Sequence, residues 1–224
     1  MTPAEDAGGT SASSRLVSLT LAGPAGPLEA LLTERDGERA SIAAVVCHPH
    51  PLYGGTMHNK VVHRVAATLH GLGAAVLRFN FRGVGKSAGG HDRGAGELDD
   101  ARAALGVLHE RLPEARLWVA GFSFGAWIAA RLAAKTPEIE KLILVAPGIR
   151  TSSFAAMHEC TTPKLVLQGT ADDTCPLEDL EREFPSWAEP KRLEKIEGAS
   201  HFFDRQLGAL GERLAIAVRE EGWA

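Results

Sequence analysis

Apolar residues follow two different patterns along the chain. Residues 15–21 and 28–33 alternate apolar with polar positions on either side of a Gly-Pro-Ala-Gly-Pro turn. This pattern predicts an antiparallel hairpin at the edge of a sheet, where one side of each strand meets solvent. Further on, apolar runs without alternation are typical of strands buried on both faces. These runs are 42–47, 74–79, 116–120, 141–146 and 164–168, and a last strand is predicted at 191–196.

Segments with helical spacing lie between the predicted strands. In the clearest of them, apolar residues recur at intervals of three and four positions and so share one helix face. They are Leu98, Ala101, Leu105, Leu108 and Leu112. The other helical segments are 58–71, 123–135, 177–187 and 205–220.

Strands that alternate with helices form right-handed crossover units, which build a parallel sheet covered on both faces. We therefore expect a single α/β domain over residues 15–224, with a mostly parallel sheet of about eight strands flanked by helices. Residues 1–14 are mostly Gly, Ser, Ala and Thr and are expected to form a flexible tail, because they have little to bury. Ligands bind such sheets at the carboxyl ends of the strands, so the residues that follow each strand are candidates for chemistry.

Composition and charge exclude several classes of protein. The 224 residues carry 24 Lys+Arg against 28 Asp+Glu, a net charge of −4, which leaves no basic excess to bind nucleic acid. The apolar runs fall far short of the roughly 18 residues that span a bilayer, so no membrane helix is expected. Three scattered cysteines do not make a disulfide framework, and the first residues do not form a secretory signal. Together these features predict a cytoplasmic protein.

The strand that ends at Ala120 runs into residues 121–125 (Gly-Phe-Ser-Phe-Gly) and then into a predicted helix. A G-x-S-x-G sequence between a strand and a helix is typical of a nucleophile elbow. Its two glycines are needed because the turn is so tight that side chains there would strike the neighbouring strand and helix. Ser123 is therefore the candidate nucleophile, near a helix N-terminus that favours developing negative charge. The alternative is that Ser123 only caps the helix.

A serine hydroxyl is a weak nucleophile unless a base and an orienting acid accompany it. Asp172 and Asp173 follow the strand at 164–168, and His201 follows the strand at 191–196. The order Ser, Asp, His is the order of the α/β hydrolases. We expect His201 to be the base and Asp172 to orient it, because Asp172 comes first out of the turn. Asp173 is the alternative acid, or a cap of the next helix.

With these motifs, the chain resembles a small lidless member of the α/β-hydrolase superfamily. Residues 47–63 (CHPHPLYGGTMHNKVVH) and 78–90 (RFNFRGVGKSAGG) resemble a bacterial subgroup of predicted serine hydrolases, and the resemblance runs from about residue 15 to the end. It implies the α/β-hydrolase fold without a cap domain and hydrolase activity, with no defined substrate. The chain departs from the common pattern at His48-Pro49, where most members have His-Gly.

The oxyanion hole of such an enzyme uses two backbone N–H groups. One is expected from Phe124, the residue after the nucleophile, and the other from the loop after the strand at 42–47. The prolines of that loop are excluded because they have no N–H. Matching the loop to His-Gly-x sequences favours the N–H of His50, with that of Leu52 as the alternative.

Two other chemistries are suggested by the sequence and have weaker support. His48, His50 and His58 are close in sequence, but no carboxylate or cysteine stands at ligand spacing beside them, as a metal site would need. Residues 85–87 (Gly-Lys-Ser) look like the end of a phosphate-binding loop, but the glycine required five positions earlier is Asn80. We therefore expect no cofactor and no metal.

The predicted strands at 141–146 and 164–168 are separated by residues 147–163, which is 17 positions and too few for a helical cap. The site is therefore expected to be open. Leu52, Tyr53, Phe154 and Met157 are predicted to line its mouth and bind substrate.

The expected function is hydrolysis of carboxylic esters of small or short-chain acyl groups, through a triad of Ser123, His201 and Asp172 and an acyl-enzyme intermediate. The expected partner is a small-molecule ester, with no nucleic acid and no membrane, and the oligomeric state is left open. Thioesterase or peptidase activity would use the same triad, because fold and triad do not encode the leaving group. A non-catalytic binding module on the same scaffold is a further alternative.

Overall fold

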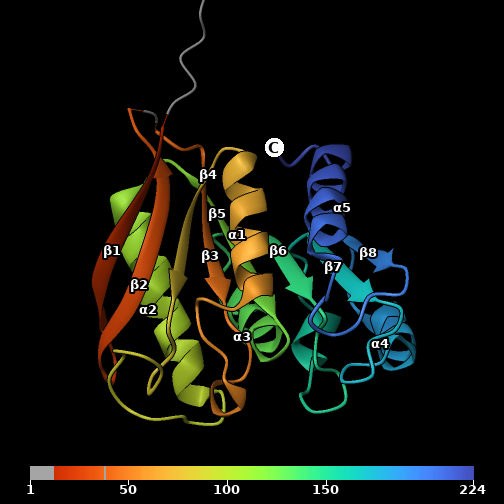
Figure 1. Cartoon of the computed structure of the whole chain (residues 1–224). Coiled ribbons are helices and arrows are strands. Elements are labelled where there is room, and N and C mark those ends of the chain that lie inside the picture. The colour runs from red at the N-terminus through yellow and green to blue at the C-terminus, as the bar shows by residue number, and fades with distance from the viewer. Residues whose placement is uncertain (1–12, 38) are drawn as a thin grey trace, which may run out of the picture.

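The computed structural model describes residues 13–37 and 39–224, and in these residues eight strands form one sheet in the order β1-β2-β4-β3-β5-β6-β7-β8 (Figure 1). The β1–β2 hairpin and the β2–β4 pair are antiparallel, and all pairs from β4 through β8 are parallel. The strands are β1 (Ser14–Gly23), β2 (Gly26–Arg35), β3 (Ile42–Cys47), β4 (Ala74–Phe79), β5 (Arg116–Phe122), β6 (Ile139–Val145), β7 (Lys164–Gly169) and β8 (Lys191–Ile196).

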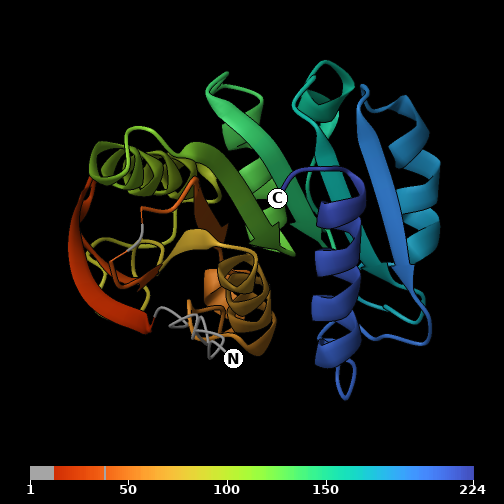
Figure 2. The same ribbon diagram turned by 90° about the horizontal axis from the view of Figure 1, so that it is seen from above.

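Five α-helices cover the two faces of the sheet (Figure 2). Apolar residues of α1 and α5 pack on one face, and those of α2, α3 and α4 pack on the other. The helices are α1 (Lys60–Gly71), α2 (Ala95–Arg111), α3 (Phe124–Ala133), α4 (Leu177–Glu183) and α5 (Leu207–Glu220). None of the helices in the described residues combines the length and apolar content needed to cross a membrane.

The central strands are apolar without alternation because both of their faces are covered. In β3, Ala43 and Val45 contribute to the core under α2 and α3, whereas Ala44 and Val46 contribute to the core under α1 and α5. Strand β1 lies at the edge of the sheet, and its side chains stay mostly exposed apart from Leu21. The sheet predicted from the sequence is thus confirmed in its number of strands and its mostly parallel order.

Several predicted boundaries differ from the structure by a few residues, and two of these differences affect the tail and the elbow. Ser14 already belongs to β1, and the rest of the predicted tail, as far as residue 12, lies outside the described residues. Strand β5 continues two residues beyond its predicted end, through Gly121 and Phe122, so the elbow begins inside the strand.

The connection from β6 to β7, residues 146–163, holds a single short 3₁₀ helix, η2 (Ala155–His158). No cap domain is inserted there, as the length of this segment predicts. The carboxyl ends of the parallel strands are therefore left uncovered by a helical layer, and the residues that follow these strands build the candidate site.

Candidate active site

Ser123 lies between β5 and α3 with φ 55° and ψ −116°, a backbone conformation that residues other than glycine rarely adopt. The neighbouring glycines make this turn possible. A Cβ atom at Gly121 would lie 2.1 Å from the carbonyl oxygen of Gly125, and one at Gly125 would lie 2.3 Å from that of Cys47. The strand, turn and helix therefore approach too closely for any side chain at these two positions.

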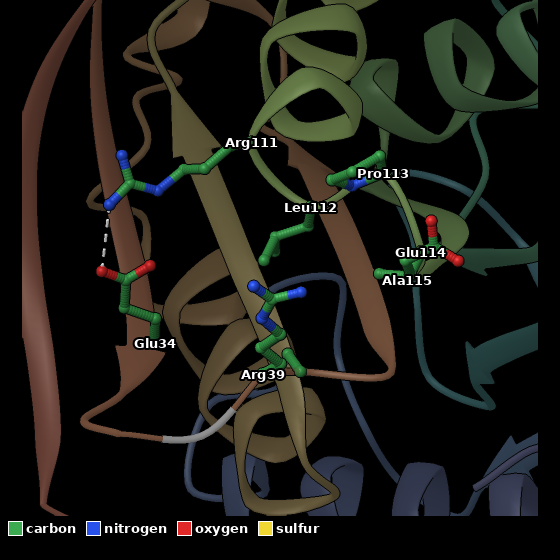
Figure 3. A pocket seen from close by; sticks show the side chains of 8 residues that line it. Glu34, Arg39, Arg111, Leu112, Pro113, Glu114 and Ala115 are labelled. Atoms are coloured by element: carbon green, nitrogen blue, oxygen red, sulfur yellow. Dashed lines mark hydrogen bonds and ion pairs between the residues drawn. The ribbon is translucent and has the colours of Figure 1, made fainter.

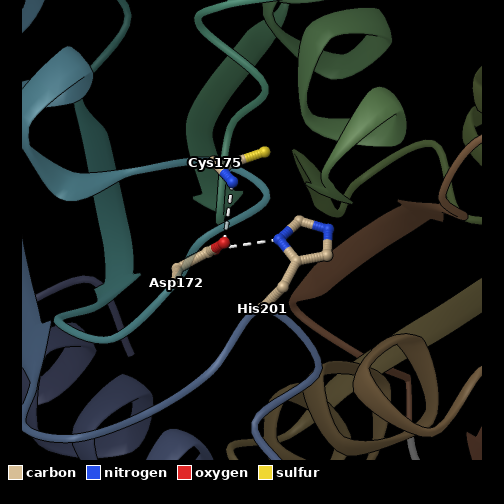
Figure 4. Close-up of side chains that lie close together, drawn as sticks. All are labelled: Asp172, Cys175 and His201. Carbon is tan, nitrogen blue, oxygen red and sulfur yellow. Dashed lines mark hydrogen bonds and ion pairs between the residues drawn. The ribbon is translucent and has the colours of Figure 1, made fainter.

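The structure brings Ser123, Asp172 and His201 together from three different loops. Nε2 of His201 lies 3.2 Å from Oγ of Ser123, and Nδ1 lies 2.8 Å from Oδ2 of Asp172. Figure 4 shows the Asp172 carboxylate directed at the imidazole ring. Asp172 and His201 are each 4% exposed, and Ser123 is half-buried. The three side chains thus stand in the hydrogen-bonded order that a nucleophile, a base and an orienting acid would need.

Asp172 is held by four donors. Its Oδ1 accepts the backbone N–H groups of Thr174 at 3.0 Å and Cys175 at 2.7 Å, and its Oδ2 accepts Nε2 of Gln168 at 3.1 Å as well as the imidazole. Donors to both oxygens fix the orientation of the carboxylate. Asp173 is exposed. Gln168 was not anticipated from the sequence, although a polar residue at the end of an apolar run was a usable signal.

Cys175 lies close enough to Asp172 and His201 that their potential ligand atoms fall within 4.8 Å of one another. Burial raises the pKa of the Cys175 thiol to about 12, so the thiol is protonated at neutral pH. A metal ligand must be the thiolate, and the carboxylate and imidazole already bind each other. This cluster suits proton transfer better than metal binding.

The loop after β3 fixes His48 in the interior. Its Nε2 accepts the N–H of Phe81 at 3.0 Å, and its Nδ1 lies 2.6 Å from the carbonyl oxygen of Pro49 and donates to it. Burial lowers the pKa of His48 to about 4, so the ring is neutral. Because both ring nitrogens are engaged, His48 is not available as a metal ligand with His50 and His58.

His50 and Phe124 lie beside Ser123 on the wall of one pocket, with their rings 4.8 Å apart. Phe124 is the first residue of α3, so its N–H has no partner within the helix. The N–H of Leu52 donates to Nδ1 of His50 at 3.2 Å. Leu52 is thereby engaged, which leaves His50 as the better placed of the two oxyanion donors that the sequence suggested.

The pocket in front of Ser123 has a volume of about 390 Å³, a size that suits a small ligand. Its walls combine aromatic, hydroxyl and cationic side chains from five segments of the chain. They are His50, Tyr53, His91, Arg93, Ser123, Phe124, Trp127, Thr151, Ser152, Thr174 and Cys175.

Comparison with known proteins agrees with this geometry. The family model described as serine aminopeptidase, S33, matches residues 41–157, more than half of the chain. The chain belongs to this family of α/β hydrolases. An uncharacterized protein of Rickettsia prowazekii is 40% identical to it over 190 residues, which cover 81% of this chain and 79% of that protein.

Two solved structures of α/β hydrolases are similar to this one. An alpha-beta serine hydrolase homologue from Coxiella burnetii has a TM-score of 0.86 at 40% identity, over 90% of this chain and 97% of that one. A serine hydrolase without lid from Xanthomonas campestris has a TM-score of 0.85 at 40% identity, over 92% of this chain and 94% of that one. The fold of this hydrolase is therefore shared with both structures, and the one from Xanthomonas campestris is described as having no lid.

Of the four residues predicted to bind substrate, Tyr53 lines the pocket of this hydrolase. Leu52 is 69% exposed and does not contribute to the pocket lining. The prediction for Phe154 and Met157 is wrong, because their side chains are 3% and 0% exposed and belong to the core. Phe154 stacks on Trp187 at 5.5 Å, so the short β6–β7 connection buries its apolar residues instead of presenting them to a ligand.

The remaining pocket walls of this hydrolase were not anticipated from the sequence. His91 and Arg93 come from the loop that precedes α2, and Trp127 comes from the first turns of α3. Thr151 and Ser152 come from the β6–β7 connection. Only Trp127, four residues after the nucleophile on the same helix, had a position from which its proximity to Ser123 could have been inferred.

A second hollow lies at the opposite end of the sheet, between β2 and the end of α2 (Figure 3). Its residues Ala40 and Ala115 precede β3 and β5, so it faces the amino ends of these strands. Arg111 binds Glu34 across it at 3.2 Å. Ligands of such sheets bind at the carboxyl ends, and this hollow has no nucleophile among its described lining residues.

Proposed function

We propose that this protein cleaves carboxylic esters of small or short-chain acyl groups through an acyl-enzyme intermediate. The observation that carries the proposal is the hydrogen-bonded order of Ser123, His201 and Asp172. The Ser123–His201 distance is 3.2 Å, the His201–Asp172 distance is 2.8 Å, and Ser123 lines the pocket. This order supplies an activated nucleophile without any further group.

In the first half of the reaction, Oγ of Ser123 attacks the ester carbonyl while Nε2 of His201 takes the hydroxyl proton. Asp172 accepts the Nδ1–H and stabilises the imidazolium that forms. The carbonyl oxygen becomes an oxyanion and binds the N–H groups of Phe124 and His50. When the C–O bond to the alcohol breaks, the alcohol leaves with the proton from Nε2.

In the second half, a water molecule takes the place of the alcohol. His201 removes one proton from the water, and the resulting hydroxide attacks the acyl carbonyl. The bond to Ser123 then breaks, its oxygen recovers the proton from Nε2, and the carboxylic acid leaves. The open pocket admits the water that this step needs.

The pocket supports an ester rather than a peptide with a free amino terminus. An aminopeptidase must bind an ammonium group, which needs a carboxylate in the substrate pocket. Among the described residues that line this pocket, no aspartate or glutamate occurs, and the charged side chain is Arg93. Thioester cleavage would use the same groups, so thioesters belong in the substrate panel.

The test is the Ser123→Ala variant, assayed on p-nitrophenyl butyrate and the matching thioester and labelled with a fluorophosphonate probe. Loss of the nucleophile is expected to lower turnover on the order of a millionfold and to abolish labelling. Ser186→Ala, at an exposed serine in the short 3₁₀ helix η3 (Phe184–Ser186), is the matched control and should keep both. If Ser123→Ala retained a tenth of the wild-type rate, the assignment would be wrong.

A further inference from the structure

The wall of the active-site pocket carries an arginine without a partner. Arg93 lines the pocket together with Ser123, and within the described residues its guanidinium makes no hydrogen bond and no ion pair. Other arginines near it are engaged: Arg82 binds Asp100 at 2.8 Å, and Arg131 donates to the carbonyl oxygen of Gly94 at 2.8 Å. Arg93 is thus a free bidentate donor beside the nucleophile.

The backbone at Arg93 is held in a strained conformation. Its φ is 50°, a value that residues other than glycine rarely adopt. Surrounding contacts must therefore impose this conformation. Glu97, fully buried, supplies these contacts: Oε1 accepts the N–H of Asp92 at 2.9 Å, and Oε2 accepts the N–H of Gly94 at 2.7 Å. One carboxylate therefore clamps the chain on both sides of Arg93 and fixes where its side chain leaves the loop.

The charges around Arg93 leave its positive charge uncompensated. The neighbouring Asp92 lies 3.9 Å from Arg82 and does not contribute to the pocket lining. The buried Glu97 is engaged as well, because its two oxygens accept backbone N–H groups and Nδ1 of His91 lies 2.7 Å from Oε1. Among the other described lining residues, Thr151, Ser152 and Thr174 contribute hydroxyl groups, and none is an aspartate or a glutamate. Such a pocket attracts a negative charge although the whole chain has a net charge of −4.

We propose that Arg93 determines specificity by binding an anionic group, such as a carboxylate, on the ester substrate. A planar guanidinium pairs with a carboxylate through two parallel N–H···O bonds, and the hydroxyl groups of the pocket lining add donors. The inference rests on the proposed function, because it places an ester carbonyl at Ser123 and the anion elsewhere in the same pocket.

Two pairs of esters of matched length test the proposal. Monoethyl adipate against ethyl hexanoate places the carboxylate on the acyl side, and 4-acetoxybutanoate against butyl acetate places it on the alcohol side. Acid release followed in a pH-stat gives kcat/KM for each ester. We expect the anionic member of at least one pair to be preferred about tenfold, which corresponds to about 1.4 kcal/mol. The pair that shows the preference identifies the side that faces Arg93.

Arg93→Gln is expected to bring the ratio of kcat/KM between the anionic and the neutral ester close to one. Arg93→Lys keeps the charge without the planar guanidinium and should retain part of the preference for the anionic ester. Arg102→Gln removes the same charge from an exposed arginine of α2 that is paired with Asp99, and should leave the ratio unchanged. Unchanged melting temperatures show that the variants are folded.

Three results would overturn the proposal: no preference in either pair, a preference that survives in Arg93→Gln, or an equal loss in Arg102→Gln. If neutral esters are cleaved and the fluorophosphonate probe labels Ser123, these results refute the role of Arg93 and leave the proposed function intact. If no ester is cleaved and no labelling occurs, the proposed function fails and the inference fails with it.

Discussion

Asp172 and Asp173 are adjacent and chemically identical, but their environments are opposite. Asp172 is 4% exposed and accepts four N–H groups, one of them from His201, whereas Asp173 is exposed. A buried carboxylate needs such donors, since an unpaired buried charge is costly. The orientation of the His201 ring therefore depends on Asp172 and not on Asp173.

We predict that Asp172→Asn lowers kcat on the order of ten-thousandfold, because an amide stabilises neither the required tautomer nor the imidazolium. Asp173→Asn is the matched control, and its kcat should stay within a few-fold of the wild-type value. Steady-state rates on p-nitrophenyl butyrate measure both. The opposite pattern would reassign the orienting acid to Asp173.

The buried imidazole of His48 makes stability depend on pH. Its pKa in the folded state is about 4, below the ordinary value of 6.5, so between these values the unfolded chain binds a proton that the folded protein does not. Stability that is present above pH 6.5 is therefore lost as the pH falls. From pH 7.5 to 5.0, this one group should lower the free energy of unfolding by about 2 kcal/mol.

This prediction is checked by urea unfolding of the His48→Gln variant at both pH values. The variant should lose about 2 kcal/mol less than the wild type between pH 7.5 and 5.0, whatever its absolute stability. His109→Gln, at an exposed position of α2, should lose as much as the wild type. Identical losses in all three proteins would show that His48 does not carry the effect.

At the scale of elements, the sequence predicts the parts whose structure depends on local pattern. Runs such as 42–47 and 74–79 match β3 and β4 because strands covered on both faces have to be apolar throughout. The elbow is predictable for a similar reason, since residues 121–125 combine a strand end, a tight turn and a helix start. Asp172 and His201 are proposed as acid and base because they follow two later strands in the order Ser, Asp, His, but chain order does not separate Asp172 from its neighbour Asp173.

The pocket walls are not predictable in the same way. An apolar residue near a site has the same sequence signature whether it lines a pocket or the core, and Phe154 proves to be a core residue. The position of Arg93 depends on Glu97, whose carboxylate binds N–H groups on both sides of it in a loop without regular structure. Such contacts leave no periodic pattern in the sequence.

The close approach of α3 to β3 gives a prediction for the elbow. In Gly125→Ala, the new methyl group would lie 2.3 Å and 2.5 Å from two backbone oxygens of residues 47 and 48, which must move apart. We expect a loss of stability of about 1–3 kcal/mol and a fall in kcat/KM on the order of a hundredfold, because Ser123 is displaced. Thermal unfolding and ester assays measure the two effects.

Gly106→Ala in α2 is the matched control for this change. A Cβ atom there would meet nothing within 4 Å, and alanine is favoured over glycine in a helix, so stability should rise by about 0.5–1 kcal/mol. Its activity should equal that of the wild type. If Gly125→Ala behaved like this control, the close packing of the elbow would be refuted.

At the scale of the whole molecule, the candidate catalytic groups lie at the carboxyl ends of the strands, where no helical layer in the described part of the chain covers them. Both faces carry helices, and the loops at the carboxyl ends of the strands are left to form the site. The β6–β7 connection has turned its apolar side chains inward, with Met157 fully buried and Phe154 stacked on Trp187. That connection, which is described in full, therefore has no exposed large apolar side chain with which to cover Ser123.

This architecture predicts an enzyme that prefers short acyl chains and shows no interfacial activation. Each methylene contributes about 0.8 kcal/mol only when it is buried, and the pocket of about 390 Å³ with its polar walls buries few of them. Rates on p-nitrophenyl esters from acetate to palmitate should peak at the short end and change smoothly through the solubility limit. A maximum at long chains, or a jump in rate where the ester forms droplets, would mean that a mobile apolar segment covers the site.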